Sequence, residues 1–299
     1  MQQQERSGIL LALSGFIFLS LGDVAIKTMA GEWSPVAVAA LRYVIGALAF
    51  AVLLAGSEGA GGFRPSHPWL QIGRGFCVAG ATLFFFCAIF VMPLATAMAV
   101  AFVSPVLVAL LSGPLLGEKV RPIVWMVSLM AMVGVMLVLR PSFAELGWAA
   151  LLPLGSATCF ALLVVANRAS AGQGSVLSMQ AYVAIIAAPP LVLAALAGHV
   201  SGIPSLAVTQ PDWTIIARCA LVAFTASTAH WLVYLGTMRA GASTIAPTSY
   251  VQMLVATLMG WWWFGDVPDL ATLGGAAIII AAGLILWRST PKASPPTPD

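Results

Sequence analysis

The strongest constraint on this chain is a series of long apolar runs separated by short polar or glycine- and proline-containing breaks. A helix of about 20 apolar residues crosses the roughly 30 Å hydrocarbon core of a bilayer. The runs are continuous and lack the polar–apolar alternation of outer-membrane strands. The sequence therefore predicts an all-α polytopic membrane protein with ten transmembrane helices, over residues 8–29, 35–55, 70–91, 94–116, 122–139, 147–166, 176–197, 213–236, 242–264 and 270–287.

Composition excludes the main soluble classes. Of the 299 residues, 61% are hydrophobic and 8% are charged, whereas a soluble domain carries about 25% charged residues. So few charges cannot keep a globule of this size in water, which excludes a soluble enzyme, a nucleic-acid binder and a disordered chain. The first run continues past Asp23 without a small-residue cleavage site. We therefore expect a retained helix there and not a signal peptide.

No motif predicts catalysis, a metal or a cofactor. Buried cysteine usually acts as a small hydrophobic residue. The four cysteines lie inside or at the edge of apolar runs and lack metal-ligand spacing (Cys77, Cys87, Cys159 and Cys219). The sequence also lacks a glycine-rich phosphate loop, a zinc-ligand set and a nucleophile elbow. We expect no catalytic residue, no bound metal and no cofactor.

The basic residues predict that both termini lie in the cytoplasm, because cytoplasmic segments gather lysine and arginine. With the amino terminus inside, nine of the thirteen basic residues fall in inner segments, namely Arg6, Arg64, Arg74, Lys119, Arg121, Arg168, Arg239, Arg288 and Lys292. The acidic residues that fall outside are Glu32, Glu145, Asp212, Asp266 and Asp269. We expect a multi-pass plasma-membrane protein, in a bacterium an inner-membrane protein, with a disordered, proline-rich cytoplasmic tail over 289–299.

The two halves of the chain resemble each other. Residues 94–142 match residues 242–290 at a shift of 148, so that Gly117 and Glu118 meet Gly265 and Asp266. Each half holds five runs, so the second half must enter the membrane from the opposite side. The sequence predicts two inverted five-helix repeats, 1–142 and 143–288, around a central cavity, an architecture suited to alternating access.

Several short motifs carry a resemblance to the EamA-type members of the drug/metabolite transporter superfamily, and the resemblance covers nearly the whole chain. In the first half they are Leu41-Arg42-Tyr43, Pro93-Leu94-Ala95-Thr96-Ala97, Ser104-Pro105 and Leu116-Gly117-Glu118-Lys119. In the second half they are Ala246-Pro247, Tyr250-Val251-Gln252 and Phe264-Gly265-Asp266-Val267-Pro268.

The resemblance implies ten helices in two inverted repeats, both termini inside, and no ATP-hydrolysing domain. It also implies a central cavity lined by the first, third, fourth, sixth, eighth and ninth helices. Two departures stand out. Asp266 replaces the usual glutamate, and the second half has no arginine corresponding to Arg42, which puts any paired role of Arg42 in doubt.

Three charged residues inside the first two runs are candidates for a gate or for ion coupling. Ionisable groups cost about 2.5–3.5 kcal/mol at the centre of a membrane helix. Asp23 and Lys27 are four residues apart, on one helical face where they can pair. Arg42 lies about two turns into the second run, counted from the same outer side of the membrane. A structural ion-pair network that fixes the first two helices is the alternative, and for Arg42 the preferred one.

His230 is the histidine that lies deep in an apolar run, in 213–236, with Tyr234 one turn later. Because histidine titrates near neutral pH, it is a candidate for the cavity or for coupling to a proton. A histidine that bonds a neighbouring helix is the commoner case.

The run 242–264 concentrates hydroxyl and amide side chains just after Pro247, namely Thr248, Ser249, Tyr250 and Gln252. Proline frees a backbone carbonyl one turn earlier, and such irregular backbone is tolerated where it lines a cavity or is buried in protein. Tyr250 and Gln252 are our main candidates for contacts with a polar ligand. Hydroxyl groups also hold helices together. Pro105 and Pro247 are candidate hinges.

Phe85, in the Phe84–Phe86 run, could present its ring to a planar substrate, although three consecutive rings point in three directions. The sequence as a whole predicts a secondary transporter that moves a small polar or amphipathic metabolite. From the resemblance, this is an amino acid, a nucleoside-like or vitamin-like compound, or a drug. A passive channel or a facilitator without ion coupling is the alternative. An intramembrane enzyme is less favoured, because an aspartyl protease would need two embedded aspartates and only Asp23 lies inside a run. The partners we expect are the substrate, the lipid bilayer and, for coupling, a proton. No nucleic acid is expected, and the protein would be a monomer or a dimer.

Overall fold

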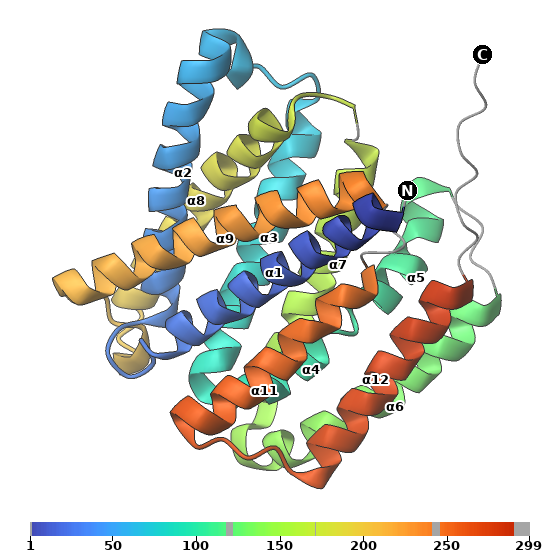
Figure 1. The fold of residues 1–299 in the computed structure, drawn as a ribbon. Coiled ribbons are helices and arrows are strands. Elements are labelled where there is room, and N and C mark those ends of the chain that lie inside the picture. Colours follow the sequence, from blue (N-terminus) through green and yellow to red (C-terminus); the bar gives the residue numbers. More distant parts are fainter. Residues whose placement is uncertain (1, 118–121, 171, 241–245, 290–299) are drawn as a thin grey trace.

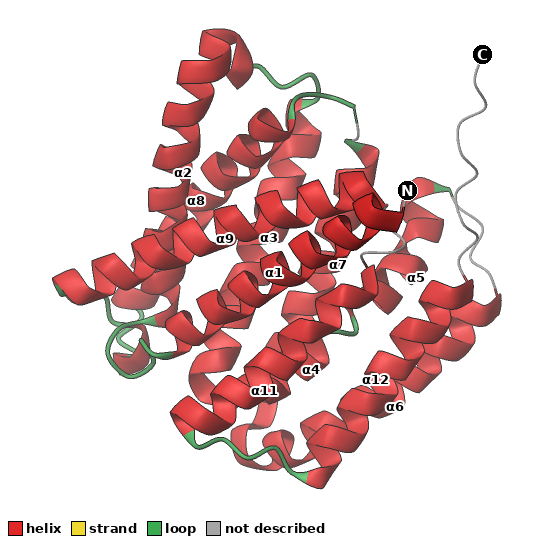
Figure 2. Ribbon diagram, viewed as in Figure 1, coloured by secondary structure: helices red, strands yellow, loops and turns green. Residues whose placement is uncertain are grey.

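The computed structural model describes residues 2–117, 122–170, 172–240 and 246–289. Across those ranges the chain is helical and contains no β-strand (Figure 2). The predicted all-α architecture is therefore confirmed. The predicted tail, 289–299, falls outside the described residues except for Ser289, which ends the last helix.

The helices follow the predicted apolar runs closely (Figure 1). In the first half they are α1 (Gln2–Lys27), α2 (Pro35–Glu58), α3 (Pro68–Val91), α4 (Leu94–Ala101), α5 (Ser104–Leu116) and α6 (Pro122–Leu146). In the second half they are α7 (Leu152–Ala169), α8 (Val176–Val200), α9 (Trp213–Ala240), α11 (Val251–Phe264) and α12 (Leu270–Ser289). Four short 3-10 segments join them, η1 (Gly59–Phe63), η2 (Gly147–Leu151), η3 (Pro204–Leu206) and η4 (Ala246–Tyr250).

Within the described residues, eight helical stretches are long and apolar enough to cross a membrane. They correspond to the first eight predicted runs, from Arg6–Lys27 to Trp213–Val233. The ninth run, 242–264, contains η4 and α11 together with residues that are not described. The tenth appears as a shorter apolar helix over Leu270–Ile285. The chain is thus a multi-pass membrane protein with at least eight candidate spans.

The fourth predicted run, 94–116, is divided into two helices. α4 ends at Ala101, two residues form a turn, and α5 begins at Ser104. Pro105 stands in the first turn of α5, where its missing N–H and fixed φ do no harm. The same arrangement, proline in the first turn, begins α2, α3 and α7.

Two helix ends use glycine for a conformation that other residues avoid. Gly117 after α5 has φ +71° and Gly265 after α11 has φ +70°, the left-handed conformation that commonly ends helices. These two glycines are the ones that the shift of 148 residues aligns. The repeat seen in the sequence therefore corresponds to equal local geometry at these two positions.

Asp269 caps the last helix, and the stability that this cap contributes depends on pH. The N–H of Thr272 donates to Asp269 Oδ1 at 2.8 Å, and bonds from the side chain and backbone of Thr272 lower the pKa of this carboxyl. A lowered pKa means that the stabilisation is complete above the unfolded pKa of about 3.9. It is lost as the pH falls through the lower folded value.

We expect Asp269→Ala to reduce the free energy of unfolding by about 1 kcal/mol at neutral pH. Asp269→Asn should keep most of the cap, because asparagine also accepts this bond, while removing the acid-dependent part. Thermal unfolding in detergent at neutral and acidic pH measures both. Equal stability of the wild type and Asp269→Ala at neutral pH would contradict the capping role.

The helices pack in antiparallel and crossed pairs that join the two halves of the chain. α1 packs on α9, α2 on α8, α3 on α7 and α6 on α12 (Figure 1). Glycine permits the closest approaches. A Cβ atom on Gly275 of α12 would lie 2.6 Å from the carbonyl oxygen of Gly134 in α6, and one on Gly134 would lie 2.8 Å from the carbonyl oxygen of Gly275. Small residues at such crossings let membrane helices approach backbone to backbone.

The bundle has two ends, which the connections between helices define. The α1–α2 end carries residues 28–34, 201–212 and 265–269, and the α2–α3 end carries residues 59–67, 170 and 172–175. Bonds between connections hold each end together: Trp33 Nε1 donates to the Thr209 carbonyl at 3.0 Å, and Ser66 Oγ donates to the Gln173 carbonyl at 3.4 Å.

Among the described residues, seven of the eight exposed tryptophans lie near the two ends of the bundle, and the eighth, Trp231, lies within α9. Toward the α2–α3 end they are Trp69 and Trp125, in the first turns of α3 and α6. Toward the α1–α2 end they are Trp148, Trp213, Trp261, Trp262 and Trp263, in η2, at the start of α9 and at the end of α11. Indole rings at this depth form the aromatic belts that lie at the two membrane–water interfaces.

Candidate functional site

A cavity of about 240 Å³ lies inside the bundle between five helices. Its lining residues on α3 and α8 lie in the halves of those helices near the α2–α3 end, while those on α2 and α9 lie near the helix midpoints. The lining comes from α2 (Arg42, Tyr43, Gly46 and Phe50), α3 (Arg74 and Val78), α7 (Phe160, Leu163 and Asn167), α8 (Gln180, Val183 and Ala184) and α9 (Ala223, Ala226, Ser227 and His230).

Arg42 sits in the wall of this cavity on α2. Its Cζ atom is 5.0 Å from the centroid of the Tyr43 ring and 5.5 Å from that of Phe86, within the range of cation–π attraction. The hydroxyl of Thr82 donates to Tyr43 Oη at 3.1 Å, which fixes one of the two rings. The guanidinium of Arg42 is thus held by aromatic faces, and the Asp23 carboxyl on α1 interacts with it electrostatically.

Arg74 is buried near the start of α3, with 5% of its surface exposed. Its Nε donates to Asn167 Oδ1 at 2.7 Å, and its Nη1 donates to Gln71 Oε1 and to Met179 Sδ, the latter at 3.2 Å. All three acceptors are neutral. Arg74 therefore ties α3 to α7 and α8 and brings a positive charge into the cavity wall without an acidic partner among them.

His230 lies on α9 and also lines the cavity, so the structure brings this predicted candidate to the site. Its Nδ1 is 2.7 Å from the Ala226 carbonyl oxygen. Because a carbonyl only accepts, Nδ1 carries a hydrogen, and Nε2 is the acceptor when the ring is neutral. The hydroxyl of Ser227 donates to the Ala223 carbonyl at 2.8 Å.

Two ion pairs bridge different helices at the α1–α2 end. Lys27, at the end of α1, lies 2.5 Å from Asp266 Oδ2 beyond α11, and its Nζ also donates to the Met92 carbonyl at 3.3 Å. The same ammonium lies 4.9 Å from the centroid of the Phe264 ring. The predicted partner four residues away, Asp23, is therefore not the acid to which Lys27 binds.

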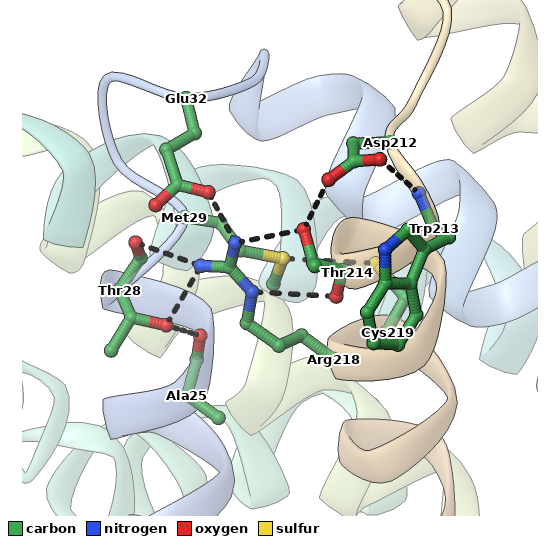
Figure 3. A network of polar contacts seen from close by, with 9 residues as sticks. All are labelled: Ala25, Thr28, Met29, Glu32, Asp212, Trp213, Thr214, Arg218 and Cys219. Atoms are coloured by element: carbon green, nitrogen blue, oxygen red, sulfur yellow. Dashed lines mark hydrogen bonds and ion pairs between the residues drawn. The ribbon is translucent and has the colours of Figure 1, made fainter.

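The second pair joins Glu32 to Arg218 on α9 (Figure 3). Arg218 also donates from Nη1 to the Thr28 carbonyl at 3.2 Å and from Nε to the Thr214 carbonyl at 3.4 Å. Asp212 holds the start of α9 by accepting from the Trp213 N–H at 2.8 Å and the Thr214 hydroxyl at 2.9 Å. The two pairs together link α1, the α1–α2 connection, α9 and the end of α11.

The polar residues predicted near Pro247 lie at another place, between η4, α11 and neighbouring helices. The Tyr250 ring packs on Phe102 with centroids 5.3 Å apart. The Gln252 carbonyl accepts from Ser20 Oγ on α1 at 3.1 Å, and its side chain donates to the Ser249 carbonyl at 3.4 Å. Thr248 is half-buried, as is Ser249. None of these four predicted candidates is among the residues that line the cavity.

The remaining predicted candidates are spread over the bundle. Phe85 is packed against the hydrophobic core from α3, and Asp23 is half-buried on α1. Tyr234 is on α9, but its side chain falls outside the described set. Pro105 and Pro247 lie at the two helix breaks, in the first turn of α5 and within η4. The described residues contain no group of three or more His, Cys, Asp or Glu side chains that could hold a metal.

One cavity residue differs from its expected place. The charge distribution assigns Arg74 to an inner segment, yet it is buried inside α3. Asn167, near the end of α7, accepts a hydrogen bond from Arg74 and also lines the cavity. The available signal was the position of Arg74 within an apolar run, where an arginine indicates a buried partner or a water-filled space.

A model of the EamA-like transporter family matches residues 6–140 and 147–288. The chain belongs to this family. Among its relatives is the S-adenosylmethionine uptake transporter of Rickettsia prowazekii, 23% identical over 96% of this chain and 94% of the relative. The pseudopaline exporter of Pseudomonas aeruginosa is 25% identical over 95% of this chain and 97% of its own length. The riboflavin transporter of Rhizobium johnstonii is 25% identical over 77% of this chain and 74% of its own.

All three relatives are named as transporters of small metabolites, and this chain is a small-metabolite transporter of the same family. A crystal structure of another protein, 21% identical in sequence, superposes with a TM-score of 0.61 over 94% of this chain and 96% of that one. That likeness shows that the two chains share a fold.

Proposed function

We propose that this EamA-type protein is a secondary carrier that moves a small polar or amphipathic metabolite by alternating access. The observation that carries the proposal is the cavity, which extends toward the α2–α3 end, together with two ion pairs that close the α1–α2 end. A carrier in one of its two states has such an arrangement. A passive channel, the alternative, needs a path that is open along its whole length.

We propose ten membrane helices in two inverted repeats, 1–142 and 143–288. In this scheme α4 and α5 form the fourth helix, and η4 and α11 belong to the ninth. The pairing of helices supports an inverted repeat, because it is unchanged when the halves are exchanged. The first helix of each half packs on the third of the other (α1 on α9, α7 on α3), the second on the second (α2 on α8) and the fifth on the fifth (α6 on α12).

We propose that Pro105 and Pro247 are the points about which the fourth and ninth helices bend. Their positions support this, because both stand at interruptions of helices that correspond in the two repeats. Interrupted helices in matching positions of two halves are typical of transporters, where they border the substrate site.

We propose that the ion pairs Lys27–Asp266 and Glu32–Arg218 form a gate that opens when the two repeats tilt. Asp23, one turn before Lys27 on α1, and Arg42, in the cavity wall on α2, interact electrostatically and would then connect this gate to the cavity. If transport is coupled to a proton, His230 and Asp23 are the residues through which we expect it to act.

We propose that the α2–α3 end faces the cytoplasm and that both termini lie on that side, in a bacterial inner membrane. The distribution of charge supports this orientation. The α1–α2 end holds Glu32, Asp212, Asp266 and Asp269, whereas the connections of the α2–α3 end hold Arg64. Positive charge gathers on the cytoplasmic side.

Uptake into proteoliposomes tests the carrier proposal. The purified full-length chain, reconstituted at known orientation, is given radiolabelled amino acids, nucleosides, riboflavin and S-adenosylmethionine. We expect saturable uptake of at least one compound class, and acceleration by an unlabelled pool of the same compound inside the vesicles. Conductance that does not saturate would instead favour a channel. A response to a pH gradient that survives Asp23→Asn with His230→Gln would contradict the coupling residues.

A further inference from the structure

We propose that the cavity recognises an organic anion, through a carboxylate or phosphate group bound by the guanidinium groups of Arg42 and Arg74. The inference rests on the proposed carrier function and specifies the substrate class of its cavity. Three features of the cavity wall support it: unused N–H donors on both arginines, the lack of an acidic residue in the lining, and the small volume of the cavity.

Arg74 has donors left over after its bonds to protein. Arginine offers five N–H groups. Those on Nε and Nη1 are directed to Asn167, Gln71 and Met179. In the part of the chain that the structure describes, no acceptor binds Nη2, and this nitrogen is not among the fully buried unpaired atoms. Since the residue lines the cavity, the Nη2 hydrogens are available to a ligand there.

Arg42 has even more unused N–H donors than Arg74. Over the described ranges it forms no hydrogen bond and no ion pair closer than 4.0 Å, and its contacts are with the faces of two aromatic rings. Aromatic faces hold a guanidinium plane in place without using its N–H groups. The edge of the Arg42 guanidinium therefore remains able to form the paired bonds that carboxylate and phosphate accept.

The charges of the cavity do not balance. None of the sixteen residues in its lining is aspartate or glutamate, while two are arginine. Asp23 attracts Arg42 from α1, but no acidic side chain of the described residues forms an ion pair with Arg74. A buried charge without a counter-charge is costly. An anionic substrate would supply the missing charge.

The other lining residues and the cavity volume indicate the size and polarity of the ligand. Phe50, Phe160 and Leu163 supply apolar walls, while Gln180 and His230 Nε2 supply neutral polar contacts. The volume of about 240 Å³ lies below the roughly 300–1,000 Å³ of pockets for drug-sized ligands. The fitting substrate is a small anion with an apolar or aromatic body, of about the size of an aromatic amino acid or keto acid.

The competing explanation is that Arg74 only holds α3 to α7 and α8. The two explanations differ in their dependence on the ligand's charge. We would compare benzoate with benzamide, indole-3-acetate with indole-3-acetamide, and phenyl phosphate with phenol, each as a ligand of the purified full-length protein. Binding is measured by calorimetry and by the rise in melting temperature in detergent.

We expect at least one anion to bind about tenfold or more tightly than its neutral counterpart, as charge-assisted bonds to arginine predict. Carboxylate pairs and the phosphate pair separate the two sources of anionic charge. Arg74→Gln should remove that preference and Arg74→Lys should retain part of it. Arg64→Gln, which removes an equal charge from the exposed connection at the same end, should leave it unchanged.

If Arg74→Gln fails to fold, Arg42→Gln and the wild-type comparison of anion with neutral analogue still decide the matter. Equal binding within every pair, binding of none at millimolar concentration, or an anion preference that survives in folded Arg74→Gln would overturn the inference. Saturable transport of neutral or cationic solutes alone would also overturn it while leaving the carrier proposal intact. Anion binding without any transport would overturn the carrier proposal and leave anion recognition intact.

Discussion

A cross-link between positions 27 and 266 is expected to abolish transport. The change is Lys27→Cys with Asp266→Cys in a chain whose four native cysteines are replaced by serine or alanine. A short bis(methanethiosulfonate) reagent then joins the two thiols by forming a disulfide with each. The reagent replaces the 2.5 Å contact between Lys27 and Asp266 by a covalent link that stays closed until it is reduced. If separation of this pair is required in each cycle, uptake falls about tenfold or more.

The measurement is uptake into proteoliposomes before the reagent, after it, and after reduction with dithiothreitol, which should restore the initial rate. The two single-cysteine variants, treated with the same reagent, control for modification alone. Undiminished transport by a fully cross-linked sample would show that this end of the bundle does not open during the cycle. Neutralisation without a cross-link has a smaller expected effect, because partly exposed ion pairs contribute about 1 kcal/mol or less.

Gly275→Leu is expected to prevent correct assembly of the bundle. A Cβ atom at this position meets the carbonyl oxygen of Gly134 and the side chain of Val138, both at 2.6 Å. One of these is backbone and cannot move aside without displacing α6 from α12. Overpacking of this kind costs about 1–3 kcal/mol or more, and here it also breaks the contact between the last helices of the two halves.

The matched control is Gly56→Leu, a glycine within α2 where an added Cβ finds nothing within 4 Å. Both variants are compared with the wild type by the yield of monodisperse protein on size exclusion and by melting temperature. We expect normal behaviour of Gly56→Leu and a strong loss for Gly275→Leu. Similar behaviour of the two would refute the close crossing of α6 and α12.

Hydropathy located the helices because the bilayer, and not the fold, decides which residues are apolar. The start of α2, the start of α8 and the end of α3 fall at the predicted residues. The same physics hides which side of a helix faces inward. Lipid is as apolar as a protein core, so Leu129 on the surface and Val127 in the core look alike in sequence.

Local spacing was also a poor guide to charge pairing. Four residues separate Asp23 from Lys27, which permits a bond, yet Lys27 meets Asp266 from the far half of the chain. That contact depends on how the halves are folded together. In the sequence, Asp266 matches Glu118 in the repeat, departs from the family pattern and is one of the acidic residues expected outside, and none of these observations names its partner.

The sequence predicts a central cavity but only part of its charged lining. Arg42 and His230 are candidates because each is polar inside an apolar run, and the structure brings both to the cavity. Tyr250 and Gln252 meet the same criterion but pack on Phe102, just after α4, and on α1. Polarity in a membrane helix indicates a non-lipid neighbour, and a neighbouring helix satisfies that condition as well as a cavity does.

The tryptophans at the two ends limit how the bundle can move. An indole ring at headgroup depth resists both deeper burial and transfer into water. The rings of Trp69, Trp125, Trp213 and Trp261 lie near one end of α3, α6, α9 and α11 respectively. Sliding any of these helices along the membrane normal would draw its anchor out of the interface, whereas pivoting about the anchored end would not. Such anchors favour a carrier that rocks in place over one that lifts its substrate across the bilayer like an elevator.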